Sequence, residues 1–205
     1  SAAAYIARHY RSLGLAAMTP TSYLQPFVAR PAASAHAGKP EMLPSQNVVA
    51  MLAGTDPVLR NQYVVIGAHF DHLGRSTEGA LDPEAGDAIR NGADDNASGT
   101  AAVMELARIF RATPTRRSLM FVNFTGEEEG LLGSAYFVEH SPVALDSIDA
   151  MMNFDMVGRL KNQRLIVYGV GTGTEFPAML DSANAGRLKI FGQGDGFGPS
   201  DQSSF

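Results

Sequence analysis

An apolar run at residues 119–124 is followed by Thr125, Gly126 and three consecutive glutamates, and this arrangement constrains the fold more than any other feature. The run is short and dense in large apolar side chains, which is typical of a buried strand. Gly126 and a second apolar stretch at 131–138 then predict a turn from this strand into a helix. In an open α/β sheet, such turns at the carboxyl ends of parallel strands form the crevice in which ligands bind.

The glutamates Glu127, Glu128 and Glu129 allow two interpretations. Adjacent carboxylates repel one another, and burial would raise their pKa values unless a cation neutralises them. They either extend into water at a helix N-terminus, where negative charge is favourable, or some of them bind a metal ion. The rest of the sequence has to decide between these interpretations.

The remaining sequence alternates between strand and helix patterns. Apolar residues at helical spacing occur at 1–13, 100–110, 130–139 and 175–185, and short apolar runs that indicate strands occur at 21–29, 47–52, 63–68, 148–154, 164–168 and 188–191. Pro26 places the first of these strands at a sheet edge, and we interpret residues 30–45 as a loop because they are rich in Ala, Pro, Gly and Ser. This order predicts an α/β fold, namely a three-layer sandwich whose mostly parallel central sheet has helices on both faces.

Composition limits the class of function. A chain of 205 residues is long enough to bury a substantial core. The net charge of −5, without a long basic run, argues against nucleic acid and anionic membranes as partners. The absence of cysteine excludes disulfides and thiolate zinc sites. No apolar stretch approaches the ~18 residues of a membrane span.

Four polar clusters follow predicted strands or precede predicted helices. They are His69 with Asp71, Asp94 with Asp95, Glu127 with Glu128, and Asp155. Imidazole and several carboxylates without thiolate are the ligand set of a hydrolytic zinc site, which keeps one position open for water. A carboxylate that bridges two metal ions allows the pair to activate one water and polarise one carbonyl. A carboxylate outside the ligand set can then act as general base.

The stretches 68–71, 92–99, 126–134 and 153–158 resemble the co-catalytic di-zinc aminopeptidases, a family that also contains glutamate carboxypeptidases and the related glutaminyl cyclases. The four motifs follow the family order across nearly the whole chain. The resemblance implies one zinc-peptidase-like domain over residues 1–205 and a zinc-dependent exopeptidase, most simply an aminopeptidase that acts on peptide N-termini. A carboxypeptidase or cyclase of the same family is the alternative among enzymes. The resemblance also favours a secreted or periplasmic location.

The resemblance assigns a role to each motif residue. Asp95 would bridge the two zinc ions, and the Asp95–Asn96 peptide bond would be cis, as is typical of the family. Asp71 would fix the tautomer of the His69 imidazole, and Glu127 would be the general base. The implied zinc ligands are His69, Asp95, Glu128 and Asp155.

One part of the family pattern is missing from this sequence. The family has a final metal-binding His beyond a segment that residues 200–205 resemble, and here Gln202 stands where that segment usually has His. We therefore expect a domain that is incomplete at its C-terminus, with only Asp95 and Glu128 left for the second zinc and with the His69 site filled first. The alternatives are an inactive metal-binding fragment, self-association, or complementation by the missing C-terminal segment.

Three neighbouring polar residues receive structural interpretations. We place His72 in a loop or at a pocket rim, with metal binding as the alternative. Asp94 is interpreted as a structural carboxylate, and Arg159 as part of a surface salt bridge rather than a substrate contact.

Overall fold

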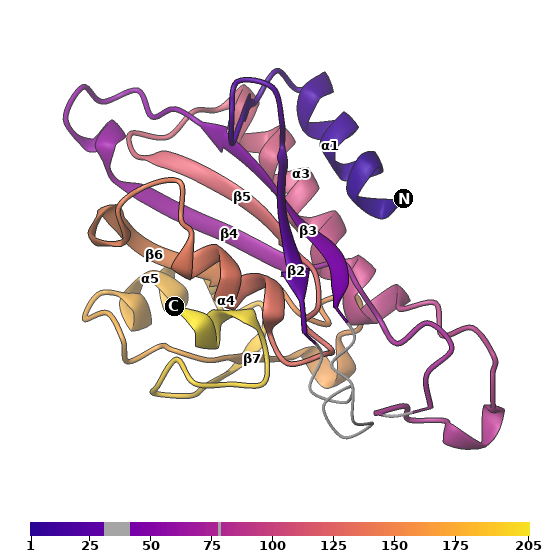
Figure 1. The fold of residues 1–205 in the computed structure, drawn as a ribbon. Helices are drawn as coiled ribbons and strands as arrows, with labels where there is room; N and C mark the ends of the chain where they lie inside the picture. The colour runs from indigo at the N-terminus through magenta and orange to yellow at the C-terminus, as the bar shows by residue number, and fades with distance from the viewer. Residues whose placement is uncertain (31–41, 78) are drawn as a thin grey trace.

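The computed structural model describes residues 1–30, 42–77 and 79–205. These residues form a central sheet with helices on both faces (Figure 1). The sheet contains β1 (Ala16–Ala17), β2 (Leu24–Ala29), β3 (Leu43–Leu52), β4 (Tyr63–His69), β5 (Ser118–Phe124) and β6 (Ile148–Asn153). A separate two-stranded sheet pairs β7 (Arg164–Val167) with β8 (Lys189–Gly192), and the α-helices are α1 (Ala2–Ser12), α3 (Gly99–Ala112), α4 (Leu132–Glu139) and α5 (Phe176–Asn184).

The strand order β1-β3-β5-β4-β6 makes the central sheet mixed rather than mostly parallel. β4 is parallel to β5 and β6, whereas β1, β2 and β5 are all antiparallel to β3. A parallel pair needs a long crossover connection, and only the later strands have one. α3 lies between β4 and β5 in the chain, and α4 lies between β5 and β6. The α/β class with helices on both faces is confirmed, and the parallel part of the sheet is the part that carries the polar motifs.

Side chains of the central strands alternate between two buried clusters, one on each face of the sheet. On one face, Ile66 and Phe121 pack with residues of α1 and α3. On the other face, Val65 and Met120 pack with Phe137 of α4. Every residue of β5 is buried. The apolar run at 119–124 is therefore a central strand, as predicted.

Several element boundaries differ from those expected. Residues 43–45 belong to β3 instead of the expected loop at 30–45, of which 31–41 lie outside the described residues. β1 was not predicted, because its two alanines form a strand only through pairing with β3. The three glutamates lie in a turn before α4, which begins at Leu132 rather than near residue 130. β2, which contains Pro26, lies at a sheet edge as predicted, since β3 is its one partner among the described strands.

The parallel strands end side by side, and this brings the polar motifs together. In the sheet register, His69 of β4 lies opposite Phe124 of β5, and Gly67 of β4 lies opposite Asn153 of β6. The segments that follow the three strands therefore leave the sheet at the same edge, which is the position of ligand sites in α/β folds.

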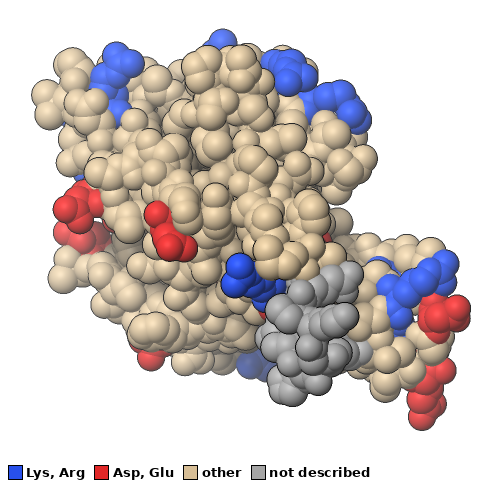
Figure 2. All heavy atoms as spheres, viewed as in Figure 1, with Lys and Arg blue, Asp and Glu red and all other residues tan. Residues whose placement is uncertain are grey.

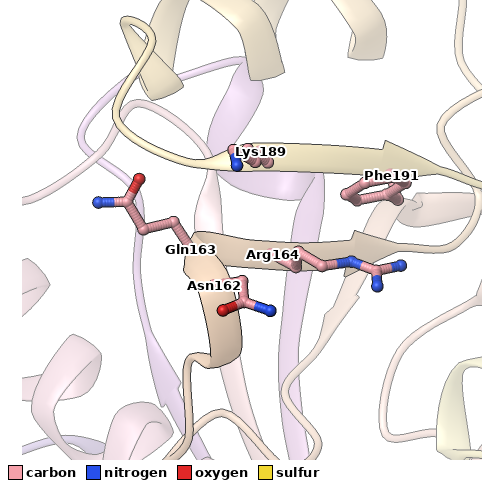
Figure 3. A pocket seen from close by; sticks show the side chains of 5 residues that line it. All are labelled: Asn162, Gln163, Arg164, Lys189 and Phe191. Atoms are coloured by element: carbon pink, nitrogen blue, oxygen red, sulfur yellow. The ribbon is translucent and has the colours of Figure 1, made fainter.

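The surface of the described residues shows a scattered distribution of charge on one face (Figure 2) and a pocket on the two-stranded sheet. On the face drawn in Figure 2, the charged side chains of the described residues occur in small separate groups. A surface pocket on β7 and β8 is lined by Asn162, Gln163, Arg164, Lys189 and Phe191 (Figure 3). There the Arg164 guanidinium lies 4.4 Å from the centre of the Phe191 ring.

Among the described residues, no helix has the length and apolar character required to cross a bilayer.

Candidate metal centre

His69, the last residue of β4, is the centre of a buried polar cluster. Its Nε2 atom lies 3.3 Å from Asp95 Oδ1 and 3.5 Å from Asp155 Oδ1, and its side chain is 1% exposed. Within the described chain, neither His69 Nε2 nor Asp155 Oδ1 has a hydrogen-bond partner, although both are buried. Donor atoms around a tetrahedral zinc ion are roughly 3.3 Å apart. The orphaned atoms therefore have the spacing and the chemistry that a zinc ion requires.

Asp95 faces a second group of donors with its other carboxylate oxygen. Asp95 Oδ2 lies 3.9 Å from His72 Nδ1, which in turn lies 2.6 Å from Glu128 Oε1. In both groups, His69–Asp95–Asp155 and His72–Asp95–Glu128, the donor atoms lie within 4.8 Å of one another. The structure thus brings together all four predicted ligands and adds His72, which lies in a loop as predicted and for which metal binding is the alternative.

Asp71 connects the His69 imidazole to the glutamate turn. His69 Nδ1 lies 3.2 Å from the backbone oxygen of Asp71, and 3.6 Å from its Oδ1 atom. Because a carbonyl oxygen only accepts, Nδ1 carries the proton of this hydrogen bond. The Asp71 carboxylate accepts the backbone N–H groups of Glu127 and Glu128, at 3.3 and 3.4 Å. These contacts direct His69 Nε2 toward the cluster.

The segment η3 (Ala93–Ser98) places Asp95 at the sheet edge. The Asp95–Asn96 peptide bond is cis, as predicted. The buried Asn96 amide donates to the Phe154 carbonyl at 2.9 Å, and its oxygen accepts the Gly99 N–H at 2.9 Å. A Cβ atom at Gly99 would lie 2.1 Å from the Phe154 oxygen, so this close contact requires glycine. Together these contacts attach η3 to the end of β6.

Asp94 belongs to neither group of donors. Its Oδ1 atom accepts the Gly158 N–H at 2.8 Å, and its Oδ2 atom pairs with Arg159 Nε at 2.9 Å. Asp94 therefore has the structural position that we expected, and Arg159 forms the expected salt bridge. Glu129, the last of the three glutamates, is exposed.

Carboxylates outnumber imidazoles in this cluster, and the pKa values reflect the imbalance. Burial raises the pKa of Asp95 and of Glu128. Burial also raises the pKa of Glu127 to about 8, although the His69 charge opposes this shift. Burial alone would lower the pKa of His69, but the nearby carboxylates of Asp155, Asp71 and Glu127 raise it to about 11. The cluster is short of positive charge, which a divalent cation would supply.

Asp201 is a buried carboxylate of this region that we did not predict. It begins η6 (Asp201–Ser204), is 0% exposed, and has both carboxylate oxygens without a hydrogen-bond partner among the described residues. Burial raises its pKa to about 7. Its charge also contributes to the raised pKa of Glu127. The one signal in the sequence was its place in the segment 200–205, which we considered only for its missing His.

Comparison with known proteins gives a family and several relatives. The model of peptidase family M28 matches residues 47–205. A probable zinc metalloprotease of Pyrenophora teres f. teres is 40% identical over 115 residues, which cover 56% of this chain and 23% of that protein. A probable leucine aminopeptidase 2 of Aspergillus oryzae is 32% identical over 154 residues, which cover 75% and 27% of the two chains. The matched part of the chain thus spans about a quarter of the length of these curated relatives.

The fold is also found among solved structures. A Zn-dependent exopeptidase from Parabacteroides distasonis matches with a TM-score of 0.73 at 19% sequence identity. The match covers 98% of this chain and 69% of that chain. At this level of identity, the likeness supports the fold that we describe and nothing more specific.

Proposed function

The chain belongs to peptidase family M28, and we propose that it is a zinc-dependent aminopeptidase that hydrolyses N-terminal residues from peptides. One observation carries the proposal. Two groups of three donors share Asp95, and the Glu127 carboxylate lies beside them without belonging to either. The names of the matched relatives, a zinc metalloprotease and a leucine aminopeptidase, support the same class of chemistry.

The residues that would hold zinc follow from the donor geometry. His69, Asp95 and Asp155 would bind one ion through atoms that are 3.3 and 3.5 Å apart. Asp71 would keep His69 Nδ1 protonated, which leaves Nε2 free as a ligand. Asp95 and Glu128 would bind the second ion. When bound, zinc acts as a Lewis acid, which polarises a carbonyl group and lowers the pKa of a water molecule.

Glu127 has the position of a general base. Its Oε2 atom lies 3.9 Å from His69 Nε2, at the edge of the first donor group. From there it can accept a proton from a water in the cluster at Oε2 and pass it to the leaving amine of the substrate. A pKa raised toward neutrality makes this carboxylate a better proton acceptor than an ordinary glutamate. Asp71, which accepts the Glu127 N–H, would hold the base in position.

Chelation of metal tests the proposed function. Hydrolysis of leucyl-p-nitroanilide should disappear after dialysis against a chelator and return when zinc is added back. The N-acetylated substrate should stay intact in both states, because an aminopeptidase requires a free amine. Hydrolysis that persists in the metal-free protein would contradict the proposal. Zinc binding without turnover would indicate a metal-binding fragment, and ammonia release from an N-terminal glutamine would indicate a cyclase.

We also propose that the chain associates with a partner segment at the open edge of the sheet. Among the described strands, β6 pairs only with β4, which leaves its second edge without a strand. Met152 of β6 is 53% exposed. Unpaired strand edges promote association between chains. Light scattering should show a mass that rises with protein concentration, whereas one constant monomer mass would contradict this proposal.

The location of the protein is likewise a proposal. Secretion or export to the periplasm is what the family resemblance favours. Fractionation of the producing cells would test it, and recovery of the protein in the cytosolic fraction alone would argue against it.

A further inference from the structure

We propose that His72 is a zinc ligand, so that His72, Asp95 and Glu128 form a second zinc site with three protein ligands inside the described chain. This inference rests on the proposed function, because it completes the second half of the same centre. The sequence alone indicates only Asp95 and Glu128 for this ion. Two carboxylates and water form a weak site, whereas a histidine and two carboxylates supply the three protein ligands that a catalytic zinc site has.

The orientation of Asp95 is the first observation that supports the site. Its Oδ1 atom lies 3.3 Å from His69 Nε2, and its Oδ2 atom lies 3.9 Å from His72 Nδ1. The two oxygens of one carboxylate are thus directed at two different imidazoles. This is the arrangement expected of a carboxylate that would bridge two ions, with one imidazole on each side.

The distances in the second group are close to those required by zinc. His72 Nδ1 lies 2.6 Å from Glu128 Oε1 and 3.9 Å from Asp95 Oδ2. Ligand atoms of a tetrahedral zinc ion are roughly 3.3 Å apart. A movement of the His72 ring by less than roughly 1 Å, away from Glu128 and toward Asp95, would make the two distances equal. The metal would then replace the proton that His72 and Glu128 share in the hydrogen bond.

The loop that carries His72 is packed so that the imidazole stays near Asp95. Gly92, with φ of +62°, lies directly against this side chain. A Cβ atom at Gly92 would come within 2.8 Å of His72 Cβ and Cγ, and within 2.5 Å of the Asp95 backbone oxygen. Both the positive φ and the close contact require glycine. The His72 side chain is 21% exposed, so the ring is partly enclosed rather than free in solvent.

A simpler interpretation is that His72 only forms a hydrogen bond to Glu128. That interpretation explains the 2.6 Å contact but not the direction of the second Asp95 oxygen. The two interpretations predict opposite effects on metal binding. If His72 is a ligand, its removal weakens the second site. If His72 only forms a hydrogen bond to Glu128, its removal frees the Glu128 carboxylate, and the zinc affinity of the second site stays the same or increases.

Zinc stoichiometry of the 205-residue chain separates the two interpretations. Metal-free protein is dialysed against buffered zinc, and the bound metal is measured by mass spectrometry. We expect two ions in the unsubstituted chain, and one ion each in the His72→Ala and His72→Asn variants. His140→Ala is the matched control, because His140 is exposed and belongs to neither donor group, and it should bind two ions. Asp155→Asn should also bind one ion, but in the second site.

The outcomes distinguish failure of this inference from failure of the proposed function. Two ions bound to both His72 variants would overturn the inference, as would one ion bound to the unsubstituted chain. Circular dichroism of the metal-free variants shows whether the chain is folded, and two different substitutions guard against misfolding of one. Zinc-dependent hydrolysis by the unsubstituted chain would still support the proposed function when the His72 inference fails.

Discussion

Replacing Glu127 with Gln is expected to lower kcat for leucyl-p-nitroanilide by about 10²–10⁴-fold, which is the usual contribution of a general base. The substitution keeps the size of the side chain and removes its ability to accept a proton. Glu127 belongs to neither donor group, so the variant should bind as much zinc as the unsubstituted chain. Turnover and bound zinc, measured on the same sample, check both parts of the prediction.

Glu129→Gln is the matched control for this experiment. It removes one carboxylate from the same turn, but Glu129 is exposed and lies outside both donor groups. Its kcat should stay within about twofold of the unsubstituted value, since exposed substitutions away from a site have small effects. Full activity of Glu127→Gln would show that another group accepts the proton. A parallel loss of zinc and activity would show instead that Glu127 acts through metal binding.

The sequence was informative where one local pattern determines the position of a residue. The apolar run at 119–124 is a central strand, as its short length and the turn residues that follow it indicated. His69 ends one of three parallel strands whose ends lie in register, and Glu127 and Asp155 follow the other two, so their convergence could be expected once the strands were recognised. The position of Asp95 could not be predicted in this way, because it depends on the contacts of Asn96 with the end of β6.

The contacts that the sequence could not predict join distant segments of the chain. His72 lies three residues after His69, and nothing in that spacing shows that its ring meets Glu128, which is 56 residues away. Asp201 is a single acidic residue in a polar tail, and only its packing in the folded chain makes it a buried carboxylate. The antiparallel pairing of β3 with β5 likewise follows from tertiary packing, since strand patterns do not encode the direction of a partner.

Replacing Asp95 with Ala is expected to remove both zinc ions, the largest effect of any single substitution in the centre. Asp95 is the one residue common to both donor groups, so each group would keep only two ligands. At a concentration 100 times its Kd, a bound ion stabilises the folded state by about 2.7 kcal/mol. Two ions should therefore give the unsubstituted chain a zinc-dependent increase in Tm of about 10–20 °C, and this increase should be absent in the variant.

Without zinc, the Asp95→Ala variant should be more stable than the unsubstituted chain. Burial raises the pKa of Asp95, so its ionised form is disfavoured in the folded state at neutral pH, and removing it should raise the Tm of the metal-free chain. Asp94→Ala is the matched control, because it removes the neighbouring carboxylate and its pair with Arg159 and leaves both donor groups intact. It should keep the zinc-dependent increase in Tm.

One ion bound to Asp95→Ala with unchanged affinity would show that the two groups do not share this carboxylate. A metal-free variant less stable than the unsubstituted chain would assign Asp95 a structural role. A carboxylate that serves only to bind metal should instead destabilise the folded state when no cation is bound.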